Sequence, residues 1–254
     1  MNASLITGLA GVDGIAVSGS NLFVANTYSG TIGEYTTSGA TVNASLITGL
    51  SSPAGIAVSG SNLFVVNNGN ATIGEYTTSG ATVNASLITG LGDAVNVAVS
   101  GSNLFVSNYA LETIGEYTTS GATVNASLIT GLHGPYALAV SGSNLFVTNY
   151  DNGTVGEYTT AGATVNASMI TTGMNFPASG IAVSGSDLSL SIFGSGRIGE
   201  YTTSGATVNA SLITGLNQPW GIVVVPVPEP ATGLLVMGGM LGLAVSRRRA
   251  GVSA

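Results

Sequence analysis

The sequence has no cysteine and no lysine, and it has a single histidine, His133, in 254 residues. Without cysteine the chain forms no disulfide and offers no thiolate to a metal ion, although the redox compartment stays open. One imidazole excludes sites that need several histidines. A Ser-His-Asp arrangement around His133 lacks the nucleophile signature G-x-S-x-G, so we expect an ordinary loop histidine. These residues lead us to assign no catalytic, cofactor-binding or metal-binding residue.

Charge is also scarce, because charged residues make up 6% of the sequence and the net charge is −7. Three of the four basic residues are Arg247, Arg248 and Arg249, which leaves Arg197 for the rest of the chain. An acidic surface repels phosphate backbones, so we expect no nucleic-acid binding. Hydrophobic residues make up 44%, which is enough for a packed core, whereas disordered chains have low hydrophobicity.

What the sequence has in abundance is repetition. The phrase GEYTT recurs at spacings of 41, 41, 41 and 43 residues, with its glutamate at Glu34, Glu75, Glu116, Glu157 and Glu200. One unit, Ser51 to Leu91, contains four short β-prone runs (residues 55–58, 62–66, 72–76 and 85–88) separated by turns rich in Gly, Ser, Asn and Thr. Four antiparallel strands in about 40–45 residues form one blade of a β-propeller. We predict an all-β propeller of five complete four-stranded blades and a partial sixth over residues 1–225. A parallel β-solenoid is the main alternative.

The unit PAGIAVSGSNLFVVNNGNATIGEY resembles the NHL repeat from about Asp13 to Val225. The residues that fit its pattern are Pro53, Gly55, Ile56, Ala57, Val58, Leu63, Phe64, Val65 and Ile73. It departs where the family often has Asp and Arg, because Asn67 and Thr72 stand there, and only the fifth unit has the arginine, Arg197. The resemblance implies the propeller fold and no particular ligand.

Variation between units gathers in two connections, the one into each first strand and the one between the second and third strands. In an up-down-up-down blade both lie on the same face of the propeller, and binding residues tend to lie on loops carried by a rigid scaffold. Neutral drift in tolerant loops is the alternative. The candidate binding face comprises Tyr28, Asp93, Tyr109, His133, Tyr136, Asp151, Phe176 and Trp220.

Two repeated polar motifs have alternative interpretations. The five glutamates of GEY could bind Ca²⁺ through oxygen ligands, but we expect them to be solvated on the outer part of the third strand. The tripeptide NAS fits an N-glycosylation sequon six times, although a three-residue match is weak evidence and here it falls at a strand edge.

The composition changes after Trp220. Residues 231–246 are uncharged and mostly apolar, with Pro-rich residues 226–230 before them and a basic tail, residues 247–254, after them. As a helix, sixteen residues would reach about 24 Å, short of the roughly 30 Å of a bilayer core, so crossing needs local thinning or help from flanking residues. We predict one transmembrane helix over 231–246 with the arginines on the cytoplasmic side and the propeller outside. Gly238 and Gly242 fit a helix-packing motif of low specificity.

The order of these parts closely resembles the PEP-CTERM sorting signal, which is also known as an ice-binding protein C-terminal domain. The residues that carry the resemblance are Val227, Pro228, Glu229, Pro230, Arg247, Arg248 and Arg249. It implies a Gram-negative exporter, a membrane-bound precursor and cleavage near the Pro-Glu-Pro motif by an exosortase, followed by release to the cell envelope or the extracellular space. The repeats offer no flat threonine array for binding ice.

These features predict a non-enzymatic, exported propeller of the envelope or extracellular matrix, whose variable face binds a ligand such as an extracellular polysaccharide or a protein. The alternative is a lactonase-type hydrolase with a metal in the central channel. A catalytic centre must break the symmetry of its ring, whereas Asn26, Asn67, Asn108 and Asn149 repeat faithfully.

The first residues, MNASLITGL, begin inside a repeat, with Met1 where other copies have valine. Residues 2–9 read as a fourth strand without its first three, and residues 221–225 as a first strand without the next three. We therefore expect that Met1 is an internal valine codon, that translation begins upstream, and that the extension supplies the missing strands and a signal peptide. As it stands, the chain is expected to form an open or gapped ring.

Overall fold

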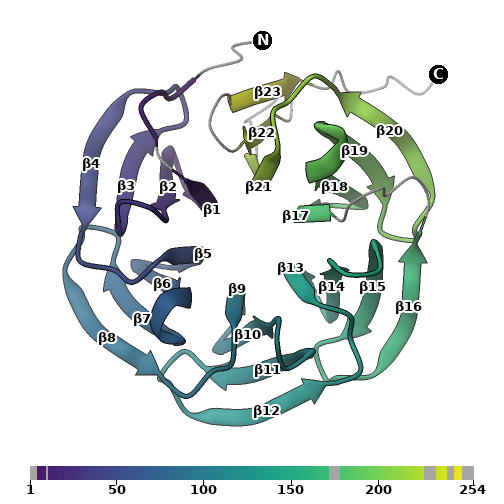
Figure 1. Ribbon diagram of the computed structural model, residues 1–254, viewed down its shortest axis with the longest axis horizontal. Helices are drawn as coiled ribbons and strands as arrows, with labels where there is room; N and C mark the ends of the chain where they lie inside the picture. The colour runs from purple at the N-terminus through teal and green to yellow at the C-terminus, as the bar shows by residue number, and fades with distance from the viewer. Residues whose placement is uncertain (1–4, 10, 172–177, 226–232, 239–242, 248–254) are drawn as a thin grey trace.

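The computed structural model describes residues 5–9, 11–171, 178–225, 233–238 and 243–247, the last two segments by their backbone alone. Its strands form a ring of radially arranged sheets, which confirms the predicted all-β propeller (Figure 1). Five sheets are complete blades of four antiparallel strands in sequence order, with the first strand at the centre and the fourth at the perimeter.

The strands of the five blades share the same lengths and order. The first blade comprises β1 (Val12–Ser18), β2 (Asn21–Asn26), β3 (Thr31–Thr36) and β4 (Thr41–Ile47). The second comprises β5 (Pro53–Ser59), β6 (Asn62–Asn67), β7 (Thr72–Thr77) and β8 (Thr82–Ile88), with the 3₁₀ turn η1 (Asn68–Asn70). The third comprises β9 (Ala94–Ser100), β10 (Asn103–Asn108), β11 (Thr113–Thr118) and β12 (Thr123–Ile129). The fourth comprises β13 (Pro135–Ser141), β14 (Asn144–Asn149), β15 (Thr154–Thr159) and β16 (Thr164–Ile170). The fifth comprises β17 (Ala178–Ser184), β18 (Asp187–Ile192), β19 (Arg197–Thr202) and β20 (Thr207–Ile213), with η2 (Phe193–Ser195).

The repeated sequence determines how each blade is built. In the phrase SGSN, Ser59 pairs with Asn62 and Gly60 adopts a φ of 57°, as a tight two-residue hairpin requires. The second strand, NLFVV, is buried on both faces because a neighbouring blade covers each side. The first five residues of the fourth strand, TVNASLI, are exposed because this strand is the outer edge of the blade. Its last residue, Ile88, is buried in the core.

The glutamates of GEY are mostly buried, so the prediction that they are solvated is wrong. Glu75 is 9% exposed and accepts a 2.7 Å hydrogen bond at Oε1 from Asn62 Nδ2 of the second strand, and the first, third and fourth blades repeat this pair. The third strand lies between two others within the blade, which is why its side chains are covered. Asp187 stands in the fifth blade where the other four have asparagine.

The ring is closed at its inner strands, so the expectation of an open ring is wrong there. A sixth sheet, β21 (Pro219–Val225), β22 (Gly233–Gly238) and β23 (Leu243–Arg247), follows the fifth blade. Its inner strand lies between β17 and β1 (Figure 1). Val223 of this strand packs on the core of the first blade. The backbones approach so closely that a Cβ on Gly221 would lie 2.6 Å from the Asp13 carbonyl oxygen. Apolar packing of β21 on β1 therefore closes the ring.

Residues near the N-terminus lie where a fourth strand of the sixth blade would end. The Leu5 carbonyl approaches Gly39 as the Leu46 carbonyl approaches Gly80 in the next blade, and Ile6 is buried. Residues 5–9 form no strand, and residues 1–4 lie outside the described residues.

The predicted transmembrane helix over 231–246 falls in a segment that the structure describes only in part and by its backbone alone. Residues 231–232 and 239–242 are not described, and the rest appear as the backbone of β22 and β23, each paired antiparallel within the sixth sheet. No helix in the described part of the chain is long and apolar enough to cross a membrane. The helix stays a prediction for the membrane-bound protein.

Candidate functional site

The two variable connections of a blade adjoin each other. Where the connection enters the first strand, its carbonyl accepts a hydrogen bond from the backbone just after the second strand. In the third blade, the Tyr109 N–H donates to the Asp93 carbonyl at 2.8 Å. In the fourth blade, the Tyr150 N–H donates to the Gly134 carbonyl at 2.8 Å. The unrepeated residues of each blade are therefore held on one side of the ring, at the ends of rigid inner strands.

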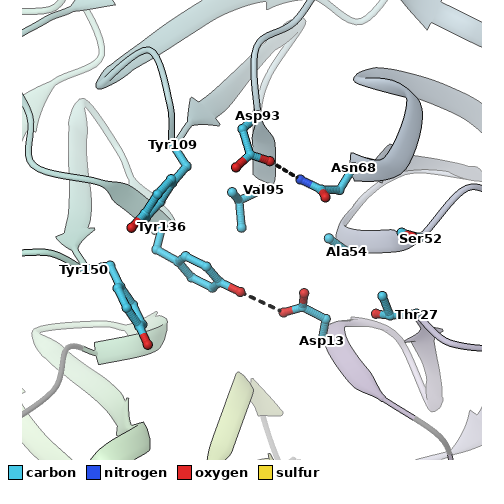
Figure 2. Close-up of a pocket in the computed structure, with 10 residues that line it drawn as sticks. All are labelled: Asp13, Thr27, Ser52, Ala54, Asn68, Asp93, Val95, Tyr109, Tyr136 and Tyr150. Carbon is cyan, nitrogen blue, oxygen red and sulfur yellow. Dashed lines mark hydrogen bonds between the residues drawn. The ribbon is translucent and has the colours of Figure 1, made fainter.

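A cavity of about 260 Å³ lies on this side, between the inner strands of the first four blades (Figure 2). It is formed by residues of both variable connections together with residues of β1, β5, β9 and β13. The lining residues are Asp13, Thr27, Ser52, Ala54, Asn68, Asp93, Val95, Tyr109, Tyr136 and Tyr150.

Asp13 and Tyr136 meet across the centre of the ring, from the first and fourth blades. The Tyr136 hydroxyl donates to Asp13 Oδ1 at 3.5 Å (Figure 2). Asp13 is half-buried, because one side faces the cavity while protein atoms surround the rest. Burial raises the pKa of its carboxyl from the usual 3.8 to about 6, and the Tyr136 hydrogen bond opposes this rise. The carboxyl is thus poised to change charge near neutral pH.

Aromatic rings continue from the cavity toward the sixth sheet. Ring centroids are 6.4 Å apart for Tyr109 and Tyr150, 5.5 Å for Tyr150 and Tyr136, and 5.5 Å for Tyr136 and Trp220. Phe193 of η2 extends the row, 4.6 Å from Trp220. These spacings lie in the range that aromatic pairs prefer, so the row fixes the position of Tyr136.

Two further carboxylates border the cavity. Asp93 Oδ1 accepts a 2.5 Å hydrogen bond from Asn68 Nδ2, and Asp151 Oδ1 accepts a 2.6 Å bond from the Tyr109 hydroxyl. The bond to Asp151 and the partial burial of the ring raise the pKa of Tyr109 to about 12. The cavity therefore offers acidic oxygens, an amide and phenol groups, and none of its ten lining residues is basic.

The structure brings together part of the predicted binding face. Asp93, Tyr109 and Tyr136 line the cavity, while Asp151 and Trp220 contact its tyrosines. Tyr28 is 82% exposed and does not line the cavity. The His133 side chain is also exposed and does not line it. The backbone of His133 holds the neighbouring loop in place, because its N–H donates to Asn149 Oδ1 and its carbonyl accepts from the Asp151 amide. Phe176 lies outside the described residues.

Seven of the ten lining residues were not among the predicted ones, and three of these, Asp13, Asn68 and Tyr150, take part in the contacts described above. Each of these three lies within a segment that varies between units, but the sequence does not indicate which residues of the segment point inward. The detectable signal was position, because Asp13 lies one residue after the start of an inner strand and Tyr150 directly follows the end of a second strand.

Metal ligands do not gather in the described residues: no three of His, Cys, Asp and Glu there are placed to hold an ion together. The oxygen atoms that side chains bring to the cavity belong to the carboxylates of Asp13 and Asp93, the amide of Asn68, and the hydroxyls of Thr27, Ser52 and the three tyrosines.

Comparison with known proteins gives one sequence match and many similar folds. The family described as PEP-CTERM protein-sorting motif matches residues 226–249, as predicted from the tail. This signal marks a protein for export to the cell envelope and for processing by a membrane-embedded exosortase. No curated protein matches the sequence.

Solved structures share the fold at low identity. A gluconolactonase from Xanthomonas campestris has a TM-score of 0.80 at 14% identity, covering 96% of this chain and 89% of its own. A streptogramin B lyase has a TM-score of 0.73 at 15% identity, covering 98% and 97%. The calcium-binding protein regucalcin from Agrobacterium tumefaciens has a TM-score of 0.71 at 14% identity, covering 93% and 85%. At this identity the likeness establishes the propeller fold and leaves activity open.

Proposed function

We propose that this protein is an exported, non-enzymatic propeller of the cell envelope or extracellular matrix that binds a ligand in the cavity at the centre of its ring. Before processing, residues 231–246 hold it in the inner membrane as a single span, with Arg247–Arg249 in the cytoplasm. The exosortase then cleaves near Pro228-Glu229-Pro230.

The observation that carries the binding function is the contrast between cavity and scaffold. Turns, second strands and buried Asn–Glu pairs recur nearly unchanged around the ring, whereas acidic and aromatic residues at positions that vary between blades converge on one cavity. Convergence of this kind on a rigid scaffold is typical of a binding site.

Catalysis is the second candidate, because the gluconolactonase and the lyase share this fold and the cavity holds two carboxylates and an amide. A lactonase-type mechanism would need a metal at Asp13, Asp93 and Asn68. We favour binding, because Tyr136 reaches across the centre of the ring and its hydroxyl is directed at Asp13, where such a metal would lie.

The sorting part of the proposal is tested with reporter fusions at two sites in the chain. A fusion after Ala254 should report from the cytoplasm, and one before Pro226 from outside. Cytoplasmic activity of the fusion before Pro226 would refute the orientation. In a host with an active exosortase, the chain should shorten, and replacing Pro228-Glu229-Pro230 with alanines should abolish the shortening.

The binding part is tested by measuring metal content and lactone hydrolysis on the purified full chain. We expect no stoichiometric metal and no turnover above the rate of the Asp13→Asn variant. One bound Ca²⁺ per chain together with lactone turnover that Asp13→Asn abolishes would replace the binding function with the enzymatic one.

A further inference from the structure

The electrostatic character of the cavity is one-sided. The charged residues that line the cavity are Asp13 and Asp93. A third carboxylate, Asp151, accepts a hydrogen bond from the hydroxyl of the lining residue Tyr109. The pKa of Tyr136 reflects this potential. Burial, and after it the charge of Asp13, raises the pKa of Tyr136 well above its usual value. Each acidic group thus adds negative potential to the same small volume.

The rest of the scaffold supplies little positive charge to offset this field. Between residues 1 and 225 the sequence has one arginine, Arg197, and no lysine. Arg197 begins β19 in the fifth blade, and the cavity is lined by the first four blades. His133 is exposed and is not among the lining residues. A charge that complements the cavity must therefore come from a ligand.

Aromatic rings form the opposite side of the cavity from Asp13 and Asn68. Tyr109, Tyr136 and Tyr150 lie together there (Figure 2). Contacts of Tyr150 with Tyr109 and Tyr136, and of Tyr136 with Trp220, hold the rings in place. Aromatic rings attract organic cations through their negative faces, and the attraction grows as the cation loses water. Carboxylates beside aromatic rings are the chemistry that recognises an ammonium group.

We propose that the cavity binds a small organic cation, whose ammonium group lies between the carboxylates of Asp13 and Asp93 and beside the rings of Tyr109, Tyr136 and Tyr150. The inference rests on the proposed binding function and specifies its ligand class. Sites for drug-sized ligands measure about 300–1,000 Å³, so a cavity of about 260 Å³ fits a molecule with few atoms beyond its charged group.

Other ligand classes fit less well. An anionic ligand would be repelled by three aspartates. A neutral sugar would leave the carboxylates without a counter-charge. A calcium ion takes six to eight oxygen ligands, preferably from several carboxylates, whereas the described residues bring two carboxylates, one amide and two aliphatic hydroxyls to this cavity, beside phenol rings, and no three acidic groups are placed to hold an ion together.

Cation binding is coupled to the proton on Asp13. The group that contacts this carboxyl is the Tyr136 hydroxyl on β13, and the other titratable groups that line the cavity are Asp93, Tyr109 and Tyr150. Because the pKa of Asp13 is about 6 in the empty cavity, the carboxyl carries a proton in much of the population at pH 5. A bound ammonium favours the ionised form, so affinity should rise between pH 5 and pH 7.

The experiment uses the full chain in a mild detergent and reads the fluorescence of Trp220, the one tryptophan, which contacts Tyr136. Calorimetry confirms each titration. The probes are choline, putrescine, glucose, glucuronate and calcium chloride, all at constant ionic strength. We expect choline or putrescine to bind with a stoichiometry of one and the other three probes not to bind.

Variants identify the site. Asp13→Asn keeps the shape and removes the charge, so ammonium binding should weaken about tenfold or more. Asp187→Asn removes the same charge from the second strand of the fifth blade, outside the cavity, and should leave the affinity unchanged. Tyr150→Leu should weaken choline binding about threefold or more through loss of a ring. Thermal unfolding of each variant verifies that it is folded.

The results separate the ligand class from the binding function. If glucose binds and the ammonium compounds do not, the cavity is a binding site but the cation proposal is wrong. If calcium binds with a stoichiometry of one and depends on Asp13, the cavity is a metal site and the proposal is likewise overturned. Ammonium binding that is equal in the wild type and Asp13→Asn would also overturn it, because the site would lie elsewhere.

Discussion

The half-buried carboxyl of Asp13 should make stability depend on pH in a defined direction. The folded state raises its pKa from 3.8 to about 6, so a proton binds more tightly in the folded chain than in the unfolded one. The contribution of this proton to the free energy of unfolding is therefore fully present below about pH 4. It is lost as the pH rises through about 6, because the carboxyl then ionises in the folded chain as well. Each pKa unit corresponds to about 1.4 kcal/mol, so ionised Asp13 destabilises the fold by at most about 3 kcal/mol.

The substitution Asp13→Asn tests this by removing the ionisation and keeping an acceptor for the Tyr136 hydroxyl. We expect the variant to match the wild type at pH 4 and to exceed it by about 1–3 kcal/mol at pH 7 and above, the lower values reflecting water in the cavity. The measurement is urea unfolding followed by Trp220 fluorescence from pH 4 to pH 8. Other titrating groups cancel in the difference between the two proteins.

A matched control is Glu112→Gln, which removes one negative charge from an exposed loop. It should change stability by less than about 0.5 kcal/mol throughout. A difference between Asp13→Asn and the wild type that is constant with pH would contradict the reasoning, because only an Asp13 whose pKa is the same in the folded and unfolded chains produces no pH dependence in this range.

Two further predictions concern hydrogen bonds between blades and within them. Asn144→Asp removes the amide donor of the 2.9 Å hydrogen bond to Glu157 and should destabilise the fold by about 1–3 kcal/mol in the same urea assay. Ser107→Ala removes a fully buried hydroxyl that donates to the Tyr136 carbonyl at 2.7 Å. It should lower the free energy of unfolding by about 1–3 kcal/mol, measured by thermal unfolding. An unchanged melting temperature would mean that this hydrogen bond contributes nothing to stability.

The repeat made the blades predictable from the sequence. Strand boundaries follow from turn residues such as Gly60 and from runs such as NLFVV, which recur in register and leave one consistent interpretation. The side of the ring that carries unrepeated residues was predictable for the same reason. The burial of Glu75 was not, because a carboxylate is solvated by default and its partner, Asn62, lies thirteen residues away on another strand.

The residues of the cavity were harder to identify, because they meet through closure of the ring. Asp13 and Tyr136 are 123 residues apart, and no local pattern indicates that the first and fourth blades face each other across the centre. That geometry depends on a sixth sheet at the ring's closing position. The sequence indicated the first strand of this blade and, in residues 2–9, its fourth strand, but not the two strands between them. The expected ring was therefore open or gapped, and its centre could not be defined.

The placement of Asp13 connects closure of the ring with the proposed site. Its backbone carbonyl lies against Gly221 of β21, and its side chain reaches Tyr136 from the opposite blade. An ionised carboxyl here costs the empty protein stability, which a fold optimised for stability alone would avoid. A bound ammonium group would recover that energy as it neutralises the charge. The same substitution, Asp13→Asn, should therefore stabilise the empty protein and weaken its binding, a pair of opposite effects that a purely structural role for Asp13 does not produce.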